Sequence, residues 1–365
     1  MTNFQIEINH SEHKKEKPES SELVFGRVFT DHMFIMDYTA GDGWHSARIV
    51  PYQPIALDPA SMIFHYGQSV FEGLKAYWTK DEKVLLFRPD RNFHRLNQSN
   101  DRLCIPHIDE EHALQALKEL INIDREWVPK AEGTSLYIRP FVIATEPFLG
   151  VAPAKRYQFI IILSPVGSYY KEGIQPVKIA VEQQFVRAVQ GGTGTAKTGG
   201  NYASSLKAQE VSSQNGYSQV LWLDGKEKKY IEEVGSMNVF FKIDGEVITP
   251  ALNGSILNGV TRSSIIELLQ HWNVTVTERR ISMDEIKEAY KAGKLEEAFG
   301  TGTAAVISPI GEFFWQDEQM IINEGNTGEL SKKLYDTLTG IQKGEIEDPF
   351  KWVQEVELRH AVSFR

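Results

Sequence analysis

The sequence has a single cysteine, Cys104, among its 365 residues. One thiol cannot form an intrachain disulfide, and it cannot supply the several thiolates of a zinc finger or zinc ribbon. The ten histidines are scattered, with His10 and His13 in a polar leader, and they form no H-E-x-x-H pair or other clustered ligand set. We therefore expect a protein of a reducing compartment that holds no metal.

Long apolar runs and an excess of positive charge are also missing. No run of apolar residues is long enough to span a bilayer, and the first 22 residues lack the apolar core of a signal peptide. Lys and Arg number 39 against 49 Asp and Glu, a formal net charge of −10, which is the wrong sign for a nucleic-acid-binding surface. These absences predict a cytoplasmic protein with no membrane partner and no nucleic-acid partner.

The length and the composition predict two folded domains. A chain of 365 residues, 41% of them hydrophobic, is long for one core. The stretch from Pro165 to Pro176 combines prolines, glycines and tyrosines between apolar segments, which is typical of a connector between domains. The predicted divisions are a polar arm with little structure of its own (1–22), a small α+β domain (23–165), a connector (166–176) and a large domain (177–365).

Both domains are predicted to mix helices with strands, so the fold class is α+β and α/β. In the first domain, apolar residues at helical spacing predict helices at 91–103 and 110–128 between aromatic-rich strands. In the second domain, Asp-Gly steps predict the turns of two hairpins, at Asp224–Gly225 and at Asp244–Gly245. Further helices are predicted at 201–214, 260–272, 283–292 and 328–342.

A glycine-rich loop surrounds one lysine in the second domain. Residues 191–202 read GGTGTAKTGGNY, with Lys197 among five glycines. Because glycine lets a backbone approach a ligand closely, the loop is typical of an amine that meets a flat or phosphorylated ligand. Two chemistries fit this pattern. One is a nucleotide-binding phosphate loop, and the other is a lysine that holds a pyridoxal cofactor as a Schiff base.

The residue before the lysine favours the second chemistry. The phosphate-loop motif G-x-x-x-x-G-K-[ST] requires glycine there, and this chain has Ala196. The candidate magnesium ligand, Asp224, precedes Gly225 and a charged stretch, which is typical of a hairpin turn. On these residues alone, a nucleotide-binding loop remains the alternative.

A pyridoxal site also needs a carboxylate at the ring nitrogen and donors for the 5′-phosphate. Glu233 lies between apolar stretches, where a charge is rare. Segment 259–264, GVTRSS, places glycine and hydroxyl residues at the start of a predicted helix, which suits a phosphate bound by free N–H groups. Segment 300–304, GTGTA, is a second glycine-threonine loop that follows an apolar strand.

Together these features resemble the class IV pyridoxal-phosphate aminotransferases, and among them the branched-chain amino acid aminotransferases. The resemblance runs from about Phe25 to beyond Ile307, in ordered blocks that read FGRVFTDHMF, YGQSVFEGLKAY, LFRPDRNFHRL, LYIRPFVIATEPFLGV, GGTGTAKTGGNYASS, EEVGSMNVFF, LNGVTRSSI and FGTGTA. It implies fold type IV, with a smaller N-terminal α+β domain and a larger C-terminal pseudo-barrel domain. It also implies pyridoxal 5′-phosphate as cofactor. Some members carry C-x-x-C where this chain has Ala305 and Ser308, so no thiol switch is expected.

The resemblance assigns roles around the cofactor ring. Lys197 is expected to form the Schiff base and then to carry the proton of the 1,3-shift. Tyr202 is expected to bond the ring oxygen. Glu233 is expected to pair with the ring nitrogen, with the adjacent Glu232 as the competing candidate.

The phosphate contacts follow from the same resemblance. Arg95 matches the phosphate arginine, although Arg88 and Arg91 lie close to it in the sequence. The remaining phosphate ligands are expected to be Val260, Thr261 and Thr303.

The substrate contacts follow as well. Thr303 and Ala304 are expected to offer N–H groups to the α-carboxylate, together with the hydroxyl of Tyr137. Arg139 lies two residues after Tyr137, on the same face of a strand, and is expected to receive the side-chain carboxylate of glutamate. The expected pocket walls are Phe25, Tyr66 and Tyr169.

The implied function is reversible amino-group transfer between leucine, isoleucine or valine and 2-oxoglutarate, carried out by a homodimer. D-Amino acid aminotransferases and aminodeoxychorismate lyases share the lysine and the glutamate, so they remain alternatives within the fold. Those enzymes are shorter, and their motifs differ from LYIRP and FEGLKAY. A nucleotide-binding protein remains the alternative outside the fold.

Overall fold

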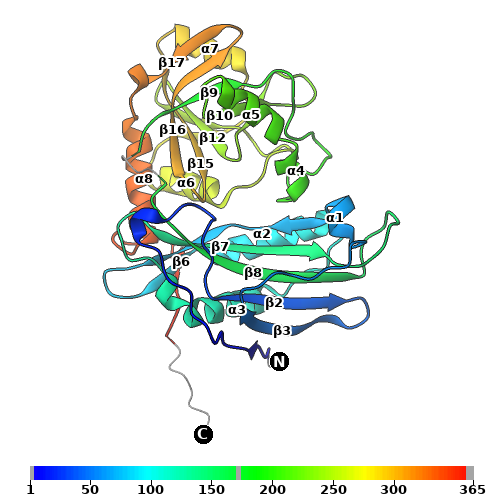
Figure 1. Ribbon diagram of the computed structural model, residues 1–365. Coiled ribbons are helices and arrows are strands. Elements are labelled where there is room, and N and C mark those ends of the chain that lie inside the picture. The colour runs from blue at the N-terminus through cyan, green and yellow to red at the C-terminus, as the bar shows by residue number, and fades with distance from the viewer. Residues whose placement is uncertain (1–3, 170–173, 359–365) are drawn as a thin grey trace. The chain divides into compact units, whose positions relative to one another are not determined.

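The computed structural model describes residues 4–169 and 174–358 (Figure 1). The chain forms two compact units: unit 1 comprises Met1–Ser168 and Gly340–Arg365, and unit 2 comprises Tyr169–Thr339. The expected connector, 166–176, includes residues 170–173, which lie outside the described residues. The described part of the chain contains no helix that is both long enough and apolar enough to cross a membrane.

Unit 1 contains a nine-stranded sheet in the order β1-β3-β2-β8-β7-β5-β6-β18, with β4 paired to β7. Every pairing is antiparallel except that of β1 with β3. The strands are β1 (Glu7–Ile8), β2 (His32–Thr39), β3 (Gly43–Pro51), β4 (Ser69–Phe71), β5 (Leu74–Trp78), β6 (Val84–Phe87), β7 (Ser135–Ala144), β8 (Arg156–Val166) and β18 (Val353–Glu355). The helices are η1 (Ser20–Glu22), α1 (Met62–Tyr66), α2 (Pro89–Arg102), α3 (Glu110–Ile123) and η2 (Arg125–Trp127).

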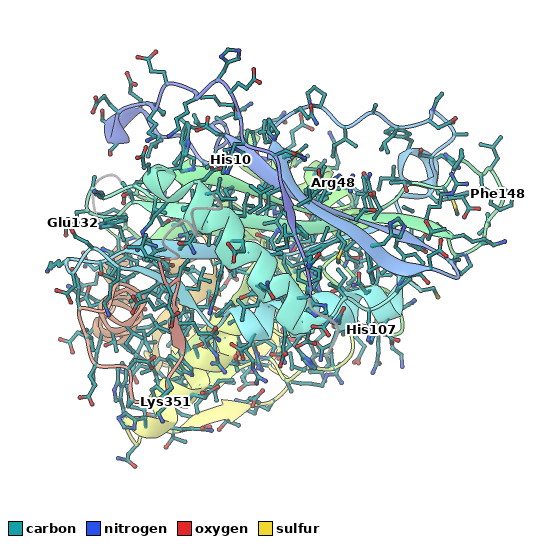
Figure 2. The ribbon with its side chains drawn as sticks, turned by 90° about the horizontal axis from the view of Figure 1, so that it is seen from below. His10, Arg48, His107, Glu132, Phe148 and Lys351 are labelled. Carbon is teal, nitrogen blue, oxygen red and sulfur yellow. The ribbon has the colours of Figure 1, made fainter. Side chains whose placement is uncertain are left out.

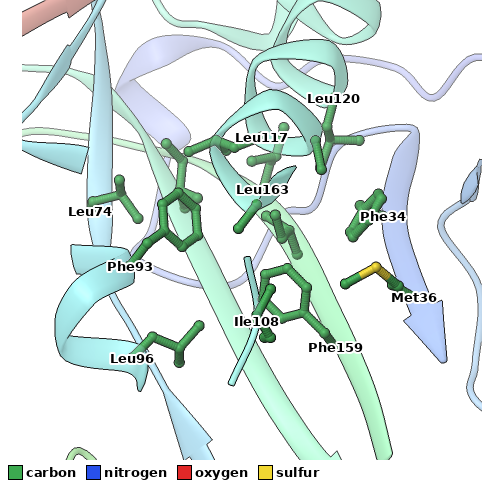
Figure 3. Close-up of a cluster of buried hydrophobic side chains, with 14 of the residues drawn as sticks. Phe34, Met36, Leu74, Phe93, Leu96, Ile108, Leu117, Leu120, Phe159 and Leu163 are labelled. Carbon is green, nitrogen blue, oxygen red and sulfur yellow. The ribbon is translucent and has the colours of Figure 1, made fainter. Parts of the chain in front are cut away.

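The two long helices of unit 1 form where the apolar spacing predicts them. Helix α3 begins after Asp109, whose side chain accepts the N–H of His112, and it ends at Ile123 rather than at residue 128. Its buried Leu117 and Leu120 pack with Phe34 of β2 and Phe159 of β8, as Figure 3 shows. Burying a side chain of this size contributes roughly 1.5–3 kcal/mol, so the helical periodicity is sufficient reason for α3 to cover this sheet face.

Strand β7 has two different faces. Leu136, Ile138 and Val142 belong to the core on the helix side of the sheet. Because strand residues alternate between faces, Tyr137 and Arg139 lie on the opposite face. The alternation therefore keeps two functional candidates off the core and side by side.

Both chain ends belong to unit 1. The N-terminal arm is extended, and its strand β1 pairs with β3, which carries the labelled Arg48 in Figure 2. The arm is also fastened by backbone N–H groups, which Ser11 donates to Nε2 of His32 and Lys15 donates to Asp31. At the other end, β18 pairs with β6, so residues 340–365 join unit 1, whereas the sequence-based limits place them in the second domain (177–365).

Unit 2 contains a second nine-stranded sheet, in the order β11-β10-β9-β16-β15-β12-β13-β14, with β17 paired to β16. The strands are β9 (Val177–Val181), β10 (Gln219–Leu223), β11 (Ile231–Val234), β12 (Asn238–Ile243), β13 (Glu246–Thr249), β14 (Val276–Glu278), β15 (Leu295–Gly302), β16 (Val306–Trp315) and β17 (Glu318–Ile321). A bridge between Val234 and Met237 joins β11 to the start of β12, so the path from β11 to β12 returns on itself. This curled sheet confirms the expected pseudo-barrel.

The helices of unit 2 are α4 (Gly199–Ala203), α5 (Leu206–Gln214), α6 (Val260–His271), α7 (Met283–Lys291), η3 (Asn323–Gly325) and α8 (Glu329–Gln342). The single helix predicted at 201–214 is interrupted at residues 204–205. The Asp244–Gly245 turn has positive φ at both residues, 51° and 81°, which is the geometry of a tight hairpin. The other Asp-Gly step begins a longer loop between β10 and β11, because the side chain of Asp224 accepts backbone N–H groups up to Tyr230.

Candidate active site

Lys197 lies immediately before helix α4, which carries Tyr202. Its Nζ donates a hydrogen bond of 2.8 Å to the Tyr202 hydroxyl. The loop that leads to Lys197 is shaped by Asn201, whose side-chain amide donates to the carbonyls of Thr193 and Ala196. Asn201 was not singled out from the sequence, although the N-Y pair that contains it was. One helical turn thus contributes a hydroxyl to the lysine and an amide that fixes the lysine's loop.

The glycines of this loop have a steric reason. A Cβ on Gly194 would overlap the carbonyl oxygen of Ser255 and the Ala188 side chain. The same carbonyl of Ser255 accepts a hydrogen bond from Nη2 of Arg187. Glycine at 194 is therefore required for the loop to pack against the segment around Ser255.

Glu233 of β11 is buried beside this loop. Its Oε1 accepts the N–H of Leu257 at 2.8 Å, and its Oε2 lies 3.3 Å from Nε of Arg187, at ion-pair distance but without hydrogen-bond direction. Burial raises the pKa of Glu233, and the charges of Arg187 and Lys197 and the Leu257 N–H oppose that rise. A carboxylate, a guanidinium and an amine thus lie within electrostatic reach of one another.

The neighbouring Glu232 has a different environment. One of its oxygens accepts hydrogen bonds from the hydroxyl of Ser255 and from the Asn253 amide. Glu233, in contrast, lines a small cavity together with Tyr202. The other residues that line it are Arg187, Asn201, Ser205, Gly235 and Ser236. The geometry therefore favours Glu233 over Glu232 as the functional carboxylate. Arg187 is a member of this cavity that sequence reasoning missed, since an arginine in a loop gives no signal of burial.

Helix α6 begins with Val260 and Thr261. Its N-cap is Gly259, and no side chain caps the helix. The N-terminus of a 12-residue helix carries partial positive charge and N–H groups that favour an anion. A Cβ on Gly259 would overlap the side-chain oxygen of Asn238, so only glycine fits there.

Thr303 and Ala304 form the turn between β15 and β16. The turn closes at Val306, which has a φ of 62°. A β-branched residue in that region is strained, and such strain gathers at binding and catalytic turns. The backbone of this turn is therefore held in an uncommon shape next to the N–H groups that the resemblance assigns to the substrate.

In unit 1, Tyr137 and Arg139 form a polar pair on β7. The Tyr137 hydroxyl accepts a 3.0 Å hydrogen bond from Nη2 of Arg139. The ring of Phe25 meets Tyr137 edge-on with centroids 4.8 Å apart, and the Arg139 guanidinium lies 4.9 Å from the centroid of Phe71. Among the described residues, no carboxylate lies within ion-pair distance of Arg139. A structural ion pair of the strand is therefore not what holds this arginine.

Arg95 of α2 is buried in unit 1 and forms a two-pronged ion pair with Glu72. Tyr66 lies elsewhere in unit 1, where its hydroxyl donates to the carbonyl of Leu149 at 2.6 Å. Tyr169 is the first residue of unit 2. Of the predicted set, the structure thus groups Lys197 with Tyr202 and Glu233 in unit 2. In unit 1 it groups Phe25, Tyr137 and Arg139.

Asp224, the candidate magnesium ligand of the nucleotide alternative, is already engaged. Its carboxylate accepts the N–H groups of Lys226, Glu227, Lys229 and Tyr230. It shapes the β10–β11 loop rather than a metal site.

A family model described as "Amino-transferase class IV" matches residues 69–313. A "Branched-chain-amino-acid aminotransferase 2" of Bacillus subtilis is 68% identical over 98% of this chain and 98% of its own length. The chain belongs to the class IV aminotransferase family.

Other members of this family are similar over most of the chain. The branched-chain-amino-acid aminotransferase of Mycolicibacterium smegmatis is 47% identical, over 90% of this chain and 91% of its own. Among solved structures, the branched-chain aminotransferase of Escherichia coli has a TM-score of 0.75 at 27% identity and covers 90% of this chain and 99% of its own. That of the organism abbreviated T.th., solved with pyridoxamine 5′-phosphate, has a TM-score of 0.73 at 26% identity and covers 88% of this chain and 98% of its own. The family and the mixed two-unit fold agree with the expectation from the sequence.

Proposed function

We propose that this protein is a pyridoxal-phosphate-dependent branched-chain amino acid aminotransferase. It transfers the amino group reversibly between leucine, isoleucine or valine and 2-oxoglutarate. The observation that carries this proposal is the meeting of the Lys197 amine, the Tyr202 hydroxyl and the buried Glu233 around one cavity wall. The names of the relatives at 47–68% identity support the branched-chain substrate over the other class IV activities.

The residues of unit 2 fit a pyridoxal ring. When bound, the cofactor supplies a protonated ring that withdraws electrons from the substrate α-carbon. Lys197 would hold the cofactor covalently at Nζ, and Tyr202 would donate to the ring oxygen. Glu233 would face the ring nitrogen, because a positive charge there favours the carboxylate that burial disfavours. Arg187 and the Leu257 N–H hold that carboxylate in place.

Lys197 also moves the proton. Once its amine is released, Nζ takes a proton from the substrate α-carbon and returns it to the neighbouring carbon of the conjugated system. The Tyr202 hydroxyl, 2.8 Å from Nζ, keeps the amine at a fixed position between the two carbons.

We assign the phosphate to the N-terminus of α6, where Val260 and Thr261 offer N–H groups. Thr303 and Arg95 complete this set. We assign the substrate α-carboxylate to the N–H groups of Thr303 and Ala304 and to the Tyr137 hydroxyl. Arg139 then receives the side-chain carboxylate of glutamate, and the aromatic residues accept the branched aliphatic side chains. These aromatic residues are Phe25, Tyr66 and Tyr169.

We further propose that the enzyme is a cytoplasmic homodimer. Helix α1 and the loop after β7 expose Phe64, Phe148, Leu149 and Val151, and Figure 2 shows Phe148 in this loop. The carbonyls of Phe148 and Leu149 bond His65 and Tyr66, which hold the loop to the helix. A fixed apolar surface of this kind suits a second copy of the chain. Light scattering on the purified protein should give about twice the mass of one chain, and a monomer would contradict the proposal.

Borohydride reduction tests the function directly. The purified protein should absorb in the yellow region, and the band should bleach on adding leucine but not on adding D-alanine. After reduction, peptide mapping should place the pyridoxyl group on Lys197. A label on Lys75 or Lys207, or an absorbance unchanged by leucine, would contradict the assignment.

A further inference from the structure

Glu72 is a fully buried carboxylate in the two-residue link between β4 and β5 of unit 1. It contacts Arg95 through two parallel bonds, from Nε to Oε1 at 2.7 Å and from Nη2 to Oε2 at 2.9 Å. Oε2 also accepts the side-chain amide of Asn92 at 2.8 Å and the N–H of Gly73 at 3.1 Å. Nothing in the roles assigned above uses this carboxylate.

Stability alone is a weak reason for such a pair. The side chains of Arg95 and Glu72 are only 8% and 0% exposed. Taking both charges out of water costs about as much as their attraction returns, and apolar residues in place of a buried pair often stabilise a protein. A buried ion pair that persists therefore suggests a geometric role.

The geometry is that of a clamp. A guanidinium is planar, so two parallel bonds along one of its edges fix both its plane and the direction of its remaining N–H bonds. Asn92 lies one turn before Arg95 on α2, and it holds Oε2 from the same helix face. The carboxylate is thus itself immobilised before it holds Arg95.

We infer that Glu72 is a positioning residue for the cofactor phosphate and that it acts through Arg95. This inference rests on the proposed function, in which Arg95 binds the phosphate. A long, flexible arginine side chain loses rotamer freedom when it binds an anion. Glu72 imposes that loss in advance, so the phosphate binds more tightly.

The test compares two ligands, pyridoxal 5′-phosphate and pyridoxal, on the full-length apoenzyme. Glu72→Gln retains an oxygen that accepts from Asn92 and Gly73, but it turns an amide toward the guanidinium. Its Kd for pyridoxal phosphate should rise about tenfold, since a charge-assisted two-pronged contact is lost. Its Kd for pyridoxal should stay within about twofold, because pyridoxal has no phosphate to feel Arg95.

The control variants separate positioning from general damage. Asp37→Asn breaks another ion pair of the same sheet, that of Asp37 with Arg48, and should change neither Kd. In an Arg95→Met background, Glu72→Gln should cause no additional change. If Glu72→Gln does not fold, Glu72→Asp, which keeps the charge but shortens the reach, should shift the same ratio of the two Kd values.

Several outcomes would overturn the inference. Equal weakening of both ligands would mean that Glu72 only supports the fold. An unchanged or tighter Kd for pyridoxal phosphate would mean that Glu72 does not orient a phosphate ligand. If Arg95→Met itself leaves the ratio of the two Kd values unchanged, the assignment of Arg95 fails, and the inference fails with it. That result is distinguishable, because it does not involve Glu72.

Discussion

Replacing Arg139 with methionine should separate the two half-reactions of the proposed enzyme. In the described structure Arg139 has no carboxylate partner, and its hydrogen bond is to the neutral hydroxyl of Tyr137 at 3.0 Å. Methionine has a similar length and can still pack on Phe71, which the guanidinium covers at 4.9 Å. The substitution therefore removes a charge and a fork of donors while it leaves most of the apolar contact.

The size of the effect follows from these contacts. A carboxylate that loses a paired guanidinium in a desolvated site loses about 2–4 kcal/mol. This corresponds to a loss of about 30- to 1,000-fold for the glutamate half-reaction, at about 1.4 kcal/mol for each factor of ten. Leucine has no side-chain carboxylate, so its half-reaction loses only the effect of a weakened Tyr137 contact. A neutral hydrogen bond contributes about 0.5–1.5 kcal/mol, which amounts to no more than about tenfold.

Single-turnover kinetics measure both half-reactions on the same protein. The cofactor absorbance is followed after mixing with leucine or with glutamate, at several substrate concentrations. Arg139→Lys, which keeps the charge without the fork, should fall between the wild type and the methionine variant with glutamate. Arg156→Met, at an exposed position of β8 in the same sheet, should change neither rate. Equal losses with leucine and glutamate would refute the reasoning and assign Arg139 to the scaffold.

Three further predictions follow from the site. Glu233→Gln should reduce turnover by about two orders of magnitude or more while cofactor stays bound, whereas Glu232→Gln should be mild; the reverse order in steady-state assays would exchange their roles. Burial lowers the pKa of Lys75 to about 8, so its charged form destabilises the fold below that pH, and the penalty disappears as pH rises toward its unfolded pKa. Lys75→Met should therefore raise the melting temperature most below pH 8 and least near pH 10, and a gain independent of pH would contradict this. A Cβ on Gly73 would overlap the Tyr137 hydroxyl, so Gly73→Ala should weaken both half-reactions, and adding Tyr137→Phe should restore part of the lost thermal stability; no recovery would place the clash elsewhere.

Local chemistry made several features predictable from the sequence. The spacing of apolar residues predicts α2 and α3, because one helix face must be buried. The turn at Asp244–Gly245 is predictable because a tight hairpin needs positive φ. Lys197 and Tyr202 are five residues apart, so one helical start is enough to bring them together. Family resemblance contributed the remaining roles and the pseudo-barrel.

The tertiary structure alone decided which distant groups meet. Arg187 reaches Glu233 across 46 positions of the sequence (233 − 187), and Glu72 reaches Arg95 from a different element. Residues 340–365 return to unit 1 because β18 adds to the free edge of β6. A sequence pattern reports the face of a helix or strand, but not which other element covers it. The difference between Glu232 and Glu233 is of this kind, since two adjacent carboxylates in one strand acquire different functions only from what packs on each side of the sheet.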